Sequence, residues 1–138
     1  MAGFSIGTLL AAYAGSAVVF FALDFIWLGF LAIGFYRSEI GQLLLERPNV
    51  LAAGAFYLFY VVGIVGFAVV PALNAQSWVW ALVAGIALGL LAYGTYDMTN
   101  LATLKNWSWK VSAVDLLWGG FITGAAALGG FWAARLTV

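Results

Sequence analysis

Four long apolar runs dominate the sequence and constrain its fold more than any other feature. They extend over about residues 6–34, 50–70, 78–104 and 111–134, and a helix needs about 20 mostly apolar residues to cross a bilayer. Such runs must be helical, because lipid cannot satisfy exposed backbone groups, and the alternating pattern of barrel strands is absent. We predict an all-α, polytopic membrane protein in which residues 1–138 form a single four-transmembrane-helix bundle.

The composition supports this class and excludes others. Hydrophobic residues make up 66% of the chain and charged residues 7%, whereas soluble domains have about 45–50% and about 25%. Five basic and five acidic residues cancel, so there is no cationic face for nucleic acid. There is no Cys and no His, which excludes iron–sulfur clusters and His-ligated haem or zinc in this chain alone. We expect no nucleic-acid partner, no cofactor and no metal site.

The basic residues predict the orientation of the bundle. Arg37 and Arg47 lie in the first connection and Lys105 and Lys110 in the third, whereas the opposite side has only Arg135 and the terminal amine. Because basic loops stay in the cytoplasm, both termini are expected on the non-cytoplasmic side of the membrane. The first run lacks a basic segment before it and is too long for a signal peptide, so it is expected to stay as a span.

The boundaries of the runs carry ordinary end signals. Asn49 and Ser77 are predicted N-caps, and Pro71 is predicted to end the second run. The first connection, residues 36–47, has two interpretations. It is either a short amphipathic helix on the bilayer surface or a helical extension of the first span.

Three aspartates interrupt the apolar runs, and an ionisable residue inside a span is a functional hypothesis by default. An ionised Asp at the centre of a span costs about 2.5–3.5 kcal/mol. At 1.5 Å per residue, Asp24, Asp97 and Asp115 lie roughly 15, 10 and 6 Å from the ends of their runs that join the basic connections. We predict that they converge in that half of the bundle, with at least two carboxylates within about 8 Å.

Helical spacing gives these aspartates aromatic and polar companions, since residues three, four and seven apart share a face. Asp97 has the richest polar neighbourhood and is the first candidate for a functional role. The companions predict a polar pocket with aromatic walls, open or nearly open to the cytoplasm, and no catalytic residue is assigned. The predicted ligand-binding residues are Asp24, Trp27, Tyr57, Tyr60, Tyr93, Tyr96, Asp97, Asn100, Asp115 and Trp118.

The pattern A-x-D-x-x-W-x-G-F occurs twice, at residues 22–30 and 113–121. An Asp followed three residues later by a Trp places the carboxyl group and the indole on one helix face. A shared site predicts that Trp27 and Trp118 line the same interior region as Asp24 and Asp115. The alternative is a coincidence of composition, because the two runs cross the membrane in opposite directions.

Each aspartate also has a structural interpretation. Asp115 follows Ser112 at the spacing of a capping box. Asp97 could pair with Lys105 or Lys110, whose long side chains can reach into the membrane. Asp24 could have a purely structural role, in which it links two helices through a hydrogen bond to a Tyr or Asn.

Several segments resemble a family of bacterial membrane proteins known as domain of unknown function 2177. They are DFIWLG (24–29), FYR (35–37), RPN (47–49), YDMTNLATL (96–104) and VDLLWG (114–119). The resemblance covers nearly the whole chain, and the segment 96–104 is its most specific part. The resemblance implies a multi-pass protein of the bacterial inner (cytoplasmic) membrane. The family has no settled activity that would imply a mechanism.

Three functions fit these observations. The first is binding or transport of a proton, a cation or an amphiphilic small molecule such as a membrane lipid, with a homodimer expected. The second is an enzyme that acts on a lipid or isoprenoid by acid–base chemistry. The third is an accessory subunit of a larger membrane complex, because the pairs Gly85/Gly89 and Gly120/Gly124 suit close packing against other helices.

Overall fold

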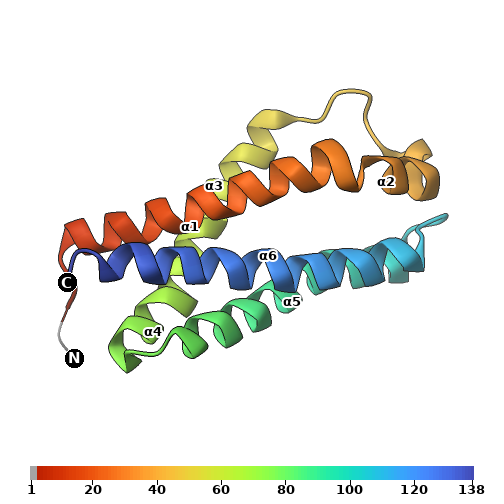
Figure 1. The fold of residues 1–138 in the computed structure, drawn as a ribbon. Helices are drawn as coiled ribbons and strands as arrows, with labels where there is room; N and C mark the ends of the chain where they lie inside the picture. The colour runs from red at the N-terminus through yellow and green to blue at the C-terminus, as the bar shows by residue number, and fades with distance from the viewer. Residues whose placement is uncertain (1–2) are drawn as a thin grey trace.

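The computed structural model describes residues 3–138, which form helices and no strand. Four segments are long and apolar enough to cross a membrane: Ile6–Leu31, Val50–Ala75, Trp78–Thr103 and Trp109–Arg135. Successive spans run in opposite directions, so that the described chain begins and ends at one end of the bundle (Figure 1). We call the opposite end, which carries the first and third connections, the connection end. The predicted all-α fold class is confirmed.

The first two spans each contain a five-residue π-helix. Helix α1 (Ile6–Ile26) continues into the π-helix Trp27–Leu31, and α2 (Ile33–Ile40) and a 3-10 turn (Gly41–Leu43) follow. Helix α3 (Val50–Ile64) continues through the π-helix Val65–Val69 into α4 (Val70–Ala75). Helices α5 (Trp78–Thr103) and α6 (Trp109–Arg135) are uninterrupted.

Pro71 does not end the second span, and this prediction was wrong. The helix continues past Pro71 to Ala75, where Gln76 adopts a left-handed conformation with φ 53°. Proline lacks an amide hydrogen and its ring clashes with the carbonyl four residues earlier. The π-helix Val65–Val69 lies directly before the proline. Its wider turns re-register the backbone hydrogen bonds, which lets the helix continue through the proline.

Two predicted N-caps are confirmed and one capping interpretation is wrong. The Asn49 side chain accepts a hydrogen bond from the Ala52 amide, and Ser77 accepts one from the Trp80 amide. Helix α6, however, begins at Trp109, and its N-cap is Ser108.

Ser112 and Asp115 therefore lie inside α6 rather than at its start. Ser112 does not cap the helix but donates its hydroxyl hydrogen to the backbone oxygen of Asp97 on α5, at 2.8 Å. The capping-box interpretation of Asp115 fails because the N-cap is Ser108, four residues before Ser112. Asp115 is consequently free to face the interior of the bundle.

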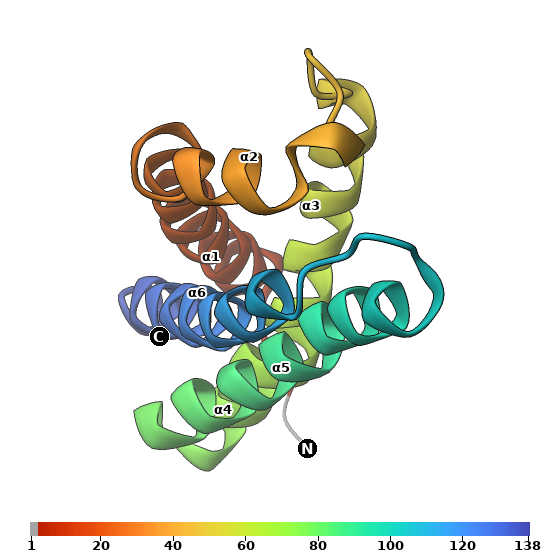
Figure 2. The same cartoon turned by 90° about the vertical axis from the view of Figure 1, so that its right-hand side faces the viewer.

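Helix α6 lies between α1 and α5, and glycines let the backbones meet (Figure 2). A β-carbon added at Gly15 of α1 would lie 2.5 Å from the backbone oxygen of Gly129 on α6. One added at Gly85 of α5 would lie 2.9 Å from the Cα of Gly124. One added at Gly89 would meet the backbone oxygen of Gly119. The glycine pairs that suggested packing against a partner are thus used within the chain.

The first connection contains a helix that is separate from α1. The backbone bends at Ala32 (φ −114°), and α2 then crosses the connection end beside α1 and α3 (Figure 2). Ile40 at its end is buried, whereas Leu43 and Leu44 lie beyond the helix and are exposed. The connection is therefore neither a continuous extension of the first span nor one amphipathic helix over residues 36–47.

Candidate functional site

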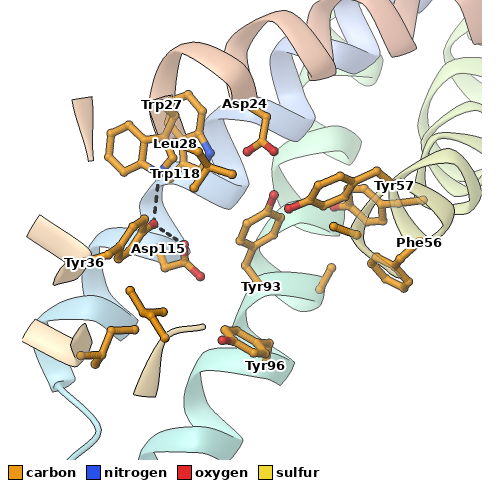
Figure 3. Close-up of a pocket in the computed structure, with 15 residues that line it drawn as sticks. Asp24, Trp27, Leu28, Tyr36, Phe56, Tyr57, Tyr93, Tyr96, Asp115 and Trp118 are labelled. Carbon is orange, nitrogen blue, oxygen red and sulfur yellow. Dashed lines mark hydrogen bonds between the residues drawn. The ribbon is translucent and has the colours of Figure 1, made fainter. Parts of the chain in front are cut away.

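A cavity of about 510 Å³ opens between α1, α2, α3, α5 and α6 near the connection end (Figure 3). No basic side chain lies among its lining residues, and two of them are carboxylates. The walls are mainly aromatic. The lining residues are Asp24, Trp27, Leu28, Tyr36, Ile40, Leu44, Ala53, Phe56, Tyr57, Tyr60, Ala92, Tyr93, Tyr96, Asp115 and Trp118.

Asp24 of α1 forms the upper carboxylate of the cavity in Figure 3. It is only 7% exposed, and it forms no ion pair with any described residue. The hydroxyl groups of Tyr57 and Tyr93 point toward one another just below it (Figure 3). The indole N–H of Trp118 approaches the Asp24 carboxylate, but this buried donor completes no hydrogen bond within residues 3–138. Asp24 is therefore a buried acid surrounded by aromatic groups without a counter-ion.

Asp115 of α6 is held by a hydrogen-bond chain that begins on the π-helix. Trp27 donates its indole N–H to the Tyr36 hydroxyl at 3.0 Å, and Tyr36 donates to Asp115 Oδ1 at 2.8 Å (Figure 3). Burial, and next the charge of Asp115, raise the pKa of Tyr36 above its ordinary value. Tyr36 therefore stays protonated and remains a donor to the carboxylate. These hydrogen bonds join the π-helix, α2 and α6 at one point.

The two copies of the repeated motif face each other across a tryptophan stack. The rings of Trp27 and Trp118 are 4.3 Å apart between centroids and inclined by 7°. Each Asp precedes its Trp by one helical turn, and α1 and α6 run in opposite directions. In Figure 3 Asp24 lies beside the stack and Asp115 lies below it. The stack therefore joins the two copies of the motif, which come from spans that run in opposite directions.

Asp97 lies behind the wall of the cavity and does not line it. Its side chain is fully buried, and neither carboxyl oxygen has a hydrogen-bond partner among the described residues. Asp115 is the charged neighbour that acts on it. The suggested pairing of Asp97 with a lysine is wrong, because Lys110 pairs with Glu39 at 3.8 Å and no ion pair involves Lys105 within the part of the chain described.

The structure brings eight of the ten predicted residues to the cavity. Asp97 and Asn100 are the two that do not line it. The cavity is lined by both tryptophans, Trp27 and Trp118, and by both aspartates, Asp24 and Asp115. Their predicted position in one interior region is therefore confirmed. The charge of Asp115 acts on both Asp24 and Asp97. The convergence of the three carboxylates, with at least two within about 8 Å, stays a prediction.

Sequence reasoning missed Tyr36, which binds Asp115 directly. The π-helix and the bend at Ala32 separate Tyr36 from the first span, so no helical periodicity connects it to Trp27 or Asp24. The apolar lining residues Leu28, Ile40, Leu44, Ala53, Phe56 and Ala92 were also missed. An apolar residue in an apolar span carries no signal that separates a cavity wall from a lipid contact.

The cavity reaches the outer surface between α3 and α5. Phe56 and Tyr96 both line it, and they are 58% and 56% exposed. Between these helices the wall consists of aromatic side chains, with the Tyr60 and Tyr93 rings 6.4 Å apart. The predicted opening of the pocket toward the cytoplasm stays a prediction. No group of three His, Cys, Asp or Glu side chains within residues 3–138 is placed to hold a metal ion.

Comparison with known proteins identifies the family. The model of a family described as predicted membrane protein (DUF2177) matches residues 9–132. The chain belongs to this family. The match includes both copies of the repeated motif and all the lining residues of the cavity. No curated protein and no solved structure matches the chain.

Proposed function

We propose that this membrane protein binds an amphiphile whose cationic, ammonium-type head group enters the cavity between Asp24 and Asp115. One observation carries the proposal: an aromatic-walled cavity of about 510 Å³ holds two carboxylates and no basic side chain among its lining residues. An uncompensated negative charge in a low dielectric favours a cation strongly. A lipid or other membrane-soluble amine would supply it.

The aromatic walls suit an ammonium group better than a metal ion. An ammonium group is attracted to the faces of Trp and Tyr rings, and this attraction strengthens when water is excluded. Trp118, Tyr57 and Tyr93 surround the position next to Asp24. A small metal cation would instead need several oxygen ligands at fixed distances.

The opening between α3 and α5 suits the apolar tail. The outer surface of α3 is apolar, with Leu51, Phe56 and Phe59 all more than half exposed. A tail that leaves the cavity beside Phe56 would lie along this surface among lipid tails. The ligand would then reach the site from within the membrane.

Binding of a defined probe tests the proposal. The protein in a neutral maltoside detergent is titrated with dodecyltrimethylammonium by calorimetry, and bound probe is confirmed by native mass spectrometry. We expect one saturable site and a loss of affinity of about 10-fold or more in Asp24→Asn, because the charge is removed while the shape is kept.

The matched control is Glu46→Gln, which removes an exposed carboxylate outside the cavity and should keep the affinity of the wild type. Dodecanol has the same chain without the charge and should not saturate the site. Equal affinity of Asp24→Asn and the wild type, or equally tight binding of dodecanol, would refute a cation site.

A further inference from the structure

We propose that Asp97 and Asp115 together hold one proton that leaves when the cationic head group binds, so that ligand binding exchanges one cation for one proton. This inference rests on the proposed function and adds a coupled activity to it. It assigns a role to Asp97, which the cavity itself does not use.

The burial of Asp97 sets the first constraint. Its side chain is 0% exposed, and both carboxyl oxygens lack a hydrogen-bond partner among the described residues. A buried ionised carboxylate is tolerated only when hydrogen bonds or a cation compensate it. The backbone of Asp97 is also fixed in place, because Ser112 binds its carbonyl oxygen at 2.8 Å. This contact holds Asp97 against α6 at Ser112, which lies about one turn before Asp115 in the same helix.

The charges around the pair set the second constraint. The titratable groups that act electrostatically on Asp97 or are acted on by it are Asp115 of α6, Tyr36 of α2 and its neighbour Tyr96 in α5, and none of them can carry a positive charge. Lys110 forms an ion pair with Glu39, so its positive charge is used there and does not compensate the two aspartates. Two adjacent carboxylates without a cation do not both ionise, and they retain one proton between them.

Asp115 connects this pair to the cavity. It is half-buried and lines the cavity, whereas Asp97 does not. An ammonium group beside Asp115 supplies the missing positive charge, so both carboxyl groups can then ionise. The balance is simple: a protonated pair of charge −1 and an ammonium ion of charge +1 give a doubly ionised pair with bound ammonium and one free proton. No bond other than one O–H bond breaks.

The rigid contact between α5 and α6 allows this exchange without a rearrangement of the helices. Gly89 and Gly119 touch through their backbones, about two helical turns from Asp97 and about one turn from Asp115. The two carboxyl groups therefore keep their separation when the proton leaves, and the electrostatic effect of the ligand is transmitted directly.

Infrared spectroscopy tests the resident proton without any ligand. The wild type near neutral pH should show the C=O stretch of a buried protonated carboxyl group, which Asp97→Asn lacks and Glu46→Gln keeps. A wild-type spectrum without such a band, or a band that survives in both Asp97→Asn and Asp115→Asn, would overturn the proton-sharing pair.

Calorimetry tests the exchange. Dodecyltrimethylammonium cannot release a proton, so any proton released on its binding comes from the protein. Titrations in two buffers of different ionisation enthalpy should give about one proton released per ligand in the wild type. Because binding releases a proton, the wild-type affinity should fall by up to about 10-fold for each unit that the pH is lowered below neutrality.

The outcomes separate the two proposals. Saturable binding with no proton release and no pH dependence would overturn the exchange and leave the cation site standing. Absence of saturable binding would overturn both. Binding by Asp97→Asn with proton release lost, against normal release in Glu46→Gln, would support the exchange.

Discussion

Two parts of this bundle are built in different ways. Helices α1, α5 and α6 meet backbone to backbone at glycines, as Gly15 with Gly129 and Gly89 with Gly119 show. Helix α3 also contains Gly54 and Gly63, yet a β-carbon at either would meet nothing within 4 Å. The three-helix part is therefore closely packed, whereas the connection-end half of α3 stands away from it (Figure 2).

The difference explains where the cavity lies. The closely packed helices hold Asp24, Asp97 and Asp115 in fixed positions, and α3 closes the site from the side with Phe56, Tyr57 and Tyr60. Two polar contacts attach this wall: the Tyr60 hydroxyl binds the Thr123 hydroxyl at 2.9 Å, and the Tyr13 hydroxyl binds the Leu58 carbonyl at 2.9 Å. A rigid acid cluster beside a wall with few contacts allows a ligand to enter without unfolding the bundle.

The largest expected effect is the loss of the glycine contact in the rigid part. In Gly89→Ala the new β-carbon would meet the backbone oxygen of Gly119, which cannot move without shifting α6. We expect a loss of unfolding free energy of about 3 kcal/mol, at the upper end for overpacked sites. Unfolding in mixed detergent, followed by circular dichroism, measures it. A loss below about 1 kcal/mol would show that α5 and α6 can separate easily.

The sequence predicted the rigid part better than the cavity wall. The four spans follow from hydropathy, and the positions of Asp24, Trp27, Asp115 and Trp118 follow from a spacing of three residues on regular helices. Periodicity fails where the helix is irregular. It therefore missed Tyr36, which lies beyond a π-helix, and it ended the second span at Pro71 because the π-helix before that proline has no sequence signal.

The next effect concerns the hydrogen-bond chain across the connection end. Tyr36→Phe removes the hydroxyl that receives the Trp27 N–H and donates to Asp115. Both partners then lose their bond in a half-buried site, and we expect a cost of about 1–3 kcal/mol in unfolding free energy near neutral pH. Ser38→Ala is the control, because Ser38 binds only an exposed backbone carbonyl in the same helix. A cost no larger than that of the control would contradict a structural role of the chain.

The same variant gives a test by pH. Burial raises the pKa of Tyr36 in the folded protein above the ordinary value of 10.0. Above about pH 10 the unfolded chain therefore loses this proton while the folded chain keeps it, and the stabilisation from Tyr36 falls as the pH rises. The gap in unfolding free energy between wild type and Tyr36→Phe should narrow between about pH 9 and pH 11. A constant or widening gap would contradict the raised pKa.

A smaller effect is expected where α3 is attached. Thr123→Val keeps the shape of the side chain and removes the partner of the Tyr60 hydroxyl. The loss of one buried neutral hydrogen bond should cost about 1 kcal/mol. The affinity for dodecyltrimethylammonium should change at most a few-fold, since Thr123 does not line the cavity. A loss of binding as large as in Asp24→Asn would show that the position of α3, rather than the carboxylate, determines the site.

The smallest effect is expected at Gly54, in the half of α3 that stands away from the other helices. Gly54→Ala adds a β-carbon that meets nothing within 4 Å, and alanine favours the helix over glycine by up to about 1 kcal/mol. The unfolding free energy should therefore stay the same or rise slightly, in contrast to Gly89→Ala under the same conditions. A marked destabilisation would mean that another molecule packs on this face of α3. Measurement of the particle mass of the wild type and of Gly54→Ala in detergent would then show whether that molecule is a second copy of the chain. A homodimer held through this face would dissociate in Gly54→Ala. It would persist in the control Gly63→Ala, which lies on a different face of the helix.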